Sequence, residues 1–130
     1  MTPDELKNRT KTFALRIIKL YRSLPKGKDA EVIGYQMLRA GTSVGANYRA
    51  ACRARSQADF VSKITIVEEE SDESAYWIEL LVESGIIKKD LLNELLKEAN
   101  ELTAIFTSSG NTAKSKRDNP QFKIRNPQSK

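Results

Sequence analysis

The spacing of apolar residues constrains the fold of this chain more than any other feature. Between about residues 57 and 84, one series advances in steps of four and three, with two small serines inside an otherwise apolar set: Phe60, Ile64, Val67, Ser71, Ser74, Ile78 and Leu81. Such steps place side chains on one face of an α-helix. Three other segments show related spacing, and no segment alternates with period two. The sequence therefore predicts an all-α fold.

Start and stop signals divide this pattern into four helices. Thr2 is a good N-cap residue with Pro3 behind it, and Pro25 and Gly27 end the first helix. The other three helices are predicted from about Asp29 to about Arg55, from about Gln57 to about Ser84 after a Ser56–Asp59 capping pattern, and from Lys89 or Asp90 to Ser108–Gly110. Four amphipathic helices with short connections favour an antiparallel up-down bundle over residues 1–109.

The composition changes sharply at the end of this bundle. Residues 110–130 hold six basic residues, one acidic residue and two prolines, and only Phe122 and Ile124 are bulky and apolar. A segment of this kind buries too little apolar surface to offset the entropy lost on ordering. We predict that residues 110–130 form a disordered basic tail.

Composition also excludes several classes of function. The 130 residues contain no histidine and one cysteine, so a histidine-dependent triad, a histidine-bound metal and a Cys-based zinc cluster are all excluded. We expect no enzyme activity, no cofactor and no metal. No apolar run approaches the ~20 residues of a membrane span. The N-terminal residues lack the apolar core of a signal peptide. A cytoplasmic protein without membrane contact is expected.

Charge is sorted along the chain, which has a net charge of +5. Residues 1–28 carry eight basic and two acidic groups, whereas residues 56–85 carry one basic and eight acidic groups. The densest acidic run is Glu68, Glu69, Glu70, Asp72 and Glu73. Three interpretations stay open: a solvated face, pairing with basic residues of the same or another subunit, and a divalent metal site. Bundle metal sites normally include Glu-x-x-His motifs, so the missing histidine disfavours the third.

The second predicted helix contains two small-residue features. Gly41 and Gly45 lie four residues apart, and each glycine costs a helix ~1 kcal/mol relative to alanine. Close approach of a neighbouring helix would explain them, although simple tolerance of weak positions is the alternative. Ser43 and Asn47 also lie four apart and share a face. We interpret them as polar residues with satisfied hydrogen bonds that fix the helix register, with a ligand-binding or catalytic role as the alternative.

The segment YQMLRAGTSVGANYRAACRARSQADF, residues 35–60, resembles a known family. It is similar to the bacterial four-helix-bundle proteins encoded within intervening sequences of 23S ribosomal RNA genes. That family carries Gln-x-x-Arg-Ala, then Thr-Ser-x-x-x-Asn, then an aromatic residue, and a Leu-Pro turn upstream. The matching residues here are Leu24, Pro25, Gln36, Arg39, Ala40, Thr42, Ser43, Asn47 and Phe60. The resemblance covers about residues 10–107.

The resemblance implies a bundle that assembles as a ring, expected to be a homopentamer, without known catalysis. It is also distantly similar to the accessory protein of diversity-generating retroelements, a basic pentameric bundle that binds nucleic acid and a reverse transcriptase. One departure is clear. Where the family often has Asn-Ile-Ala-Glu-Gly, this chain has Asn47-Tyr48-Arg49-Ala50-Ala51, which replaces an acid by a basic stretch.

Two hypotheses for function follow. In the first, the protein binds RNA, DNA or a ribonucleoprotein through basic residues at helix ends and in the tail: Arg49, Arg53, Arg55, Lys63, Lys114, Lys116 and Arg117. In the second, it is a scaffolding oligomer with a protein partner, and its charges join subunits. Residues expected to pack helices or subunits are Gln36, Arg39, Gly41, Ser43, Gly45 and Asn47.

Overall fold

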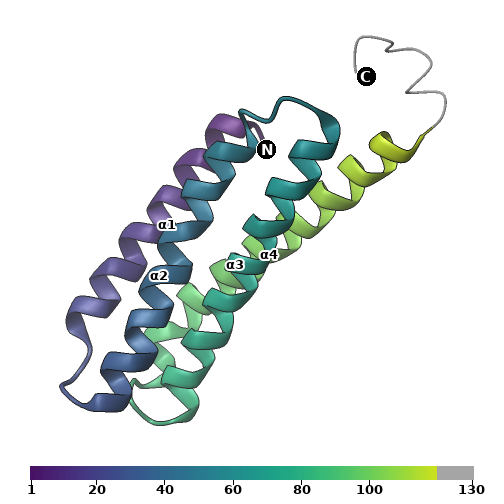
Figure 1. The fold of residues 1–130 in the computed structure, drawn as a ribbon. Coiled ribbons are helices and arrows are strands. Elements are labelled where there is room, and N and C mark those ends of the chain that lie inside the picture. The colour runs from purple at the N-terminus through teal and green to yellow at the C-terminus, as the bar shows by residue number, and fades with distance from the viewer. Residues whose placement is uncertain (120–130) are drawn as a thin grey trace.

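The computed structural model describes residues 1–119, which form four helices and no strand. The helices are α1 (Pro3–Ser23), α2 (Lys28–Ala51), α3 (Gln57–Glu83) and α4 (Lys89–Asp118). Consecutive helices run in opposite directions and pack side by side as a bundle (Figure 1). The predicted all-α, four-helix architecture is confirmed.

Side-chain caps set the starts of α1 and α3, as the sequence predicts. The Thr2 hydroxyl accepts a hydrogen bond from the Glu5 amide at 3.1 Å, and the Ser56 hydroxyl accepts one from the Asp59 amide at 3.0 Å. Each bond satisfies an amide that has no partner within its helix. Gly27, with φ of 151°, turns the chain between α1 and α2.

The core runs the length of the bundle along the stripes that helical spacing predicts. In α3, six of the seven residues in the series are buried, and Phe60 is half-buried. The largest fully buried side chains include Phe13 of α1, Met37 of α2 and Phe106 of α4. The buried Ser74 hydroxyl donates to the Glu70 carbonyl at 2.7 Å, so this small polar residue is accommodated inside its own helix.

The glycines of α2 lie against α1. A Cβ atom at Gly41 would lie 2.7 Å from Cγ1 of Ile17, and one at Gly45 would lie 3.1 Å from the Thr10 hydroxyl oxygen. A Cβ at Gly34 would lie 2.5 Å from Cδ1 of Leu24. Three glycines therefore form a groove on α2 into which side chains of α1 fit, and close helix approach explains their positions.

Two predicted helix ends are wrong. The second helix ends at Ala51 rather than near Arg55, because the hydrogen-bond spacing changes there. The Arg53 and Ala54 amides bond to carbonyls three residues earlier, instead of the four residues of an α-helix. The fourth helix continues to Asp118 rather than ending at Ser108–Gly110. Its apolar stripe extends through the buried Gly110 and Ala113, and a Cβ at Gly110 would lie 3.6 Å from Ile64.

Residues 110–118, predicted as the start of a disordered tail, are thus the last turns of α4. The glycine that looks like a stop signal is instead a small residue at a helix contact. Residues 120–130, the rest of the predicted tail, lie outside the described part of the chain.

The antiparallel order brings three features to one end of the bundle. The N-terminus, the α2–α3 connection and the last turns of α4 all lie at this end (Figure 1). The side-chain amide of Gln57 donates to the Ala113 carbonyl at 3.3 Å, which joins the start of α3 to the end of α4. We call this the basic end, because all seven cations of the first hypothesis lie on the elements that meet there.

The glycine groove yields a prediction. Replacing Gly41 with alanine pushes a methyl group against Ile17, a stiff β-branched side chain that meets it with Cβ and the two Cγ atoms rather than with a flexible tip. Overpacking costs ~1–3 kcal/mol, and the better helix propensity of alanine returns ~1 kcal/mol. We expect Gly41→Ala to lower the free energy of unfolding by up to about 2 kcal/mol in urea denaturation.

A double-mutant cycle provides the control. Ile17→Ala removes the two Cγ atoms that the new methyl group would meet at 2.7 and 2.9 Å and leaves only the Cβ at 3.2 Å, so Gly41→Ala should cost much less in that background. Equal costs in both backgrounds would show that the two helices do not approach each other closely here.

Candidate functional site

A basic hollow lies beside the α2–α3 connection. Arg53, Arg55 and Lys63 line an open depression of about 500 Å³ together with Ala50 and Asp59. Arg53 and Arg55 belong to the connection itself, while Lys63 lies nearly two turns into α3. Within residues 1–119, no carboxylate forms an ion pair with either arginine. Their guanidinium groups are therefore available to an anion from outside.

Asp59 organises this hollow. Its carboxylate accepts a hydrogen bond from the Lys63 ammonium at 2.6 Å and another from the Arg55 backbone amide at 3.2 Å. These two bonds, the one from Lys63 above all, hold the pKa of Asp59 below its ordinary value of 3.8. The carboxylate thus fixes the connection and positions Lys63, and it neutralises one of the three cations.

Four further predicted cations lie on helices at the basic end. Arg49 is exposed one turn before Arg53. Lys114 and Lys116 are exposed on the last turns of α4, whereas Arg117 is half-buried and pairs with Asp118 at 2.8 Å. The structure thus brings Arg53, Arg55 and Lys63 into one hollow and places the other four at the same end of the bundle.

A second and larger hollow at this end was not anticipated from the sequence. It has a volume of about 690 Å³ and is open to solvent. All four helices contribute to its wall, including Leu6 of α1, Tyr48 of α2, Phe60 of α3 and Ser109 of α4. Arg55 lines both hollows, so the two share a wall. No sequence signal marks it, because its residues come from four separate segments.

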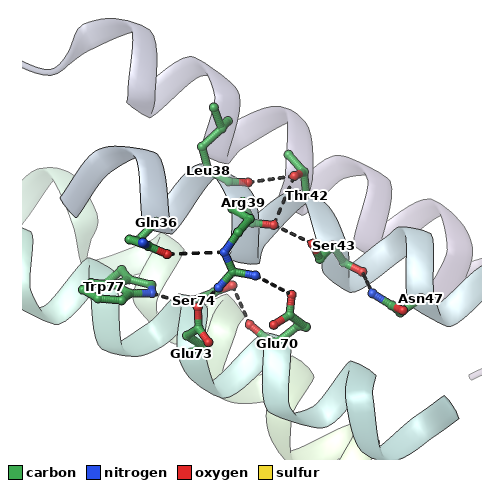
Figure 2. Close-up of polar contacts among 10 residues, drawn as sticks. All are labelled: Gln36, Leu38, Arg39, Thr42, Ser43, Asn47, Glu70, Glu73, Ser74 and Trp77. Carbon is green, nitrogen blue, oxygen red and sulfur yellow. Dashed lines mark hydrogen bonds and ion pairs between the residues drawn. The ribbon is translucent and has the colours of Figure 1, made fainter. Parts of the chain in front are cut away.

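The predicted packing residues fall into two groups on different sides of α2. Arg39 faces α3, where it forms ion pairs with Glu70 at 3.3 Å and with Glu73 (Figure 2). Gln36 accepts from the Arg39 guanidinium at 3.3 Å, and the Trp77 ring nitrogen donates to Glu73 at 3.1 Å. Arg39 and two members of the acidic run of α3 are therefore paired within one chain.

Ser43 and Asn47 follow Arg39 along α2 and lie nearer to the basic end (Figure 2). The Ser43 hydroxyl donates to the Arg39 carbonyl at 2.6 Å, and the Asn47 amide donates to the Ser43 carbonyl at 2.8 Å. These bonds stay inside α2. Gly41 and Gly45 face α1 instead. Of the predicted packing residues, Arg39 and the two glycines therefore contact neighbouring helices, whereas the hydrogen bonds of Ser43 and Asn47 lie within α2.

Two contacts of α4 were missed at the sequence level. Arg9 of α1 donates to Glu98 at 2.7 Å and to Glu101 at 2.8 Å, and the hydrogen bond with Glu98 is the main reason that the pKa of Arg9 is raised. Thr107 donates to Glu68 at 2.5 Å, which engages another member of the acidic run. Both link residues far apart in sequence, where spacing carries no signal.

Within residues 1–119, no group of three or more histidine, cysteine or acidic residues is arranged to hold a metal ion. In the same range, no helix has the length and apolar character needed to cross a membrane.

The hydrogen bonds that the Asp59 carboxylate accepts predict a pH dependence of stability. A carboxylate whose folded-state pKa is lowered adds stability above its ordinary pKa of 3.8, and this stability is lost as the pH falls through the lower folded value. We expect Asp59→Asn to be less stable than the parent protein at neutral pH. The difference in free energy of unfolding should shrink as the pH falls below 3.8.

Glu94→Gln is the control, since Glu94 is an exposed carboxylate of α4 without an ion pair or hydrogen bond to residues 1–119. A stability difference for Asp59→Asn that does not change between pH 7 and pH 2 would contradict the assigned role of its charge.

Comparisons with known proteins agree with this architecture. The family model of the 23S rRNA-intervening sequence protein matches residues 5–108. A crystal structure of a protein of unknown function, from the S23 ribosomal protein family of Bacteroides thetaiotaomicron, is similar with a TM-score of 0.78 and 34% identity. The similarity covers 85% of this chain and 99% of that one. No curated protein matches. The chain belongs to the family of 23S rRNA-intervening sequence proteins.

Proposed function

We propose that this protein binds nucleic acid, with RNA as its first target, through the basic end of the bundle. The observation that carries the proposal is the hollow lined by Arg53, Arg55 and Lys63, in which neither arginine is paired with a carboxylate of residues 1–119. Arginine and lysine side chains grouped on one surface bind phosphates by displacing condensed counterions. The name of the family, which refers to 23S rRNA, makes RNA the first nucleic acid to test.

The distribution of charge supports this location. Much of the acidic run of α3 is occupied, because Glu70 and Glu73 bind Arg39 and Glu68 binds Thr107. At the basic end, the hollow contains one carboxylate, Asp59, which forms an ion pair with Lys63 and also attracts the charge of Arg55, against three cations. Lys114 and Lys116 add exposed positive charge on α4. A polyanion approaching this end therefore meets a surplus of cations.

The proposal involves no catalysis. That the protein is not an enzyme and that it is cytoplasmic both stay predictions from the sequence.

The test is a salt titration of binding. Full-length protein is mixed with a fluorescent structured RNA, and the affinity is measured between about 50 and 200 mM salt. We expect the logarithm of affinity to fall linearly with the logarithm of salt concentration. The variant Arg49→Gln/Arg53→Gln should bind more weakly, with a slope shallower by about 0.7–0.9 for each phosphate that the variant no longer neutralises.

Lys26→Gln/Lys89→Gln provides the matched control, since it removes the same charge from the opposite end of the bundle. Its salt slope should stay close to that of the parent protein. Absence of binding at 50 mM salt, or an equal effect of the two double variants, would contradict a specific role for the basic end. Truncations should retain residues 110–118, because these residues complete α4.

A second candidate function, self-assembly as a scaffold, is favoured by a different observation. The exposed face of α1 from Lys11 to Arg22 carries only basic charges around an exposed Leu15. The exposed face of α3 carries Glu69 and Asp72 between the exposed Ile66 and Tyr76. These two helices occupy opposite corners, since each packs against α2 and α4 rather than against the other. The basic face of α1 and the acidic face of α3 suit a head-to-tail contact, in which α1 of one copy meets α3 of the next. Such contacts form a ring when the last copy meets the first.

We expect sedimentation to show an oligomer, with five copies as the number implied by the resemblance. Glu69→Lys/Asp72→Lys should shift it toward monomer, because like charges would then meet across the contact. Combining this variant with Lys11→Glu/Arg16→Glu should restore assembly. A parent protein that sediments as a monomer would remove this candidate.

A further inference from the structure

We infer that the larger hollow at the basic end binds an unpaired base of a single-stranded segment whose phosphates lie in the adjacent basic hollow. This inference rests on the proposed function and specifies the form of nucleic acid that is bound. It is carried by the arrangement of two hollows of different chemistry around one shared arginine, Arg55.

The larger hollow combines an apolar floor with an accessible aromatic ring. Leu6, Tyr48 and Ala51 are buried at its base, where the Tyr48 ring packs against Phe106 with centroids 5.4 Å apart. Phe60 is only half-buried and lines the same space. A volume of about 690 Å³ lies in the range of small-ligand sites. An aromatic side chain at the side of such a space offers a surface on which a flat base can stack.

Polar groups surround this floor. Gln57 lines the hollow, and its amide nitrogen donates to the Ala113 carbonyl at 3.3 Å, which fixes the orientation of the carboxamide. The carboxamide oxygen has no hydrogen bond from residues 1–119 and is available to accept one. Ser109 and Lys7 contribute further polar groups to the wall. The hollow thus provides what a base requires: an apolar face for its ring and hydrogen-bonding groups for its edges.

The neighbouring hollow is suited to the sugar–phosphate backbone instead. Its wall holds Arg53, Arg55 and Lys63 and no bulky apolar side chain. Because Arg55 lines both spaces, a strand with its phosphates on the arginines can place a base directly in the apolar hollow. A paired base lies inside a duplex and cannot enter without being unpaired, which costs a few kcal/mol. The arrangement therefore favours single strands, in RNA or DNA, over duplexes.

The experiment compares a single strand with a duplex of the same sequence. Full-length protein is titrated at fixed salt with a fluorescent 12-nucleotide single-stranded RNA, its DNA equivalent and the RNA duplex. We expect the single strands to bind more tightly than the duplex. Phe60→Leu should weaken single-strand binding by roughly 5- to 150-fold, the loss expected for one stacked base, and should leave duplex binding unchanged.

Two further variants keep the test independent of folding. Phe60→Trp retains an aromatic face and should preserve the preference for single strands. Tyr35→Leu removes an exposed aromatic ring near the start of α2, at the opposite end of the bundle, and should change nothing. A single strand carrying 2-aminopurine adds a direct signal, since its fluorescence should fall when the base stacks on Phe60. Circular dichroism checks that each variant is folded.

The outcomes separate the two proposals. If neither single strand nor duplex binds, the proposed function itself fails. If both bind with equal affinity, or if Phe60→Leu weakens both by the same factor, the base-binding hollow is overturned while phosphate binding at the basic end stands. A preference for single strands that Phe60→Leu abolishes and Phe60→Trp preserves supports the inference.

Discussion

The contact between α1 and the glycine groove of α2 holds the first helix in the bundle. α1 packs mainly against α2 and much less against α4, so its position depends on how closely these two helices approach. Gly34, Gly41 and Gly45 permit that approach, since each faces a side chain of α1 or of its C-cap residue. On the side of α4, Arg9 adds a charged link to Glu98 and Glu101. The larger hollow at the basic end depends on both contacts, because α1 provides one of its walls.

The distribution of unpaired charge depends on which charged side chains of each helix are paired within the chain. Arg39 reaches the acidic run of α3 from the middle of α2, so repulsion among these carboxylates is reduced within the chain. Exposed ion pairs of this kind contribute ~0–1 kcal/mol each, so the network matters more for where charge remains than for stability. Arg49, Arg53 and Arg55 at the basic end have no ion pair with a carboxylate of residues 1–119, and the same holds for the exposed cations of α1 from Lys11 to Arg22. Arg49 lies at the point where this chain departs from the family pattern.

Much of this architecture could be predicted from the sequence, and what could not be predicted has identifiable causes. Helical periodicity and the caps at Thr2 and Ser56 are local signals, and the structure agrees with them. Gly110 misled the prediction because a glycine that ends a helix and a glycine that packs against another helix look alike in sequence. The difference lies in Ile64, 46 positions away, which contacts it. The larger hollow was unpredictable for the same reason, since its wall exists only once four helices have met.

The extension of α4 also bears on how the basic end works. If residues 110–118 were a flexible tail, their cations would bind phosphates only after losing conformational entropy. Because these residues are helical and anchored through Gln57 and the buried Ala113, Lys114 and Lys116 are held at the same end as the arginine hollow. A charged surface that is already ordered loses less freedom on binding than a flexible one. The helical packing that misled the sequence analysis therefore favours the function proposed for this end of the molecule.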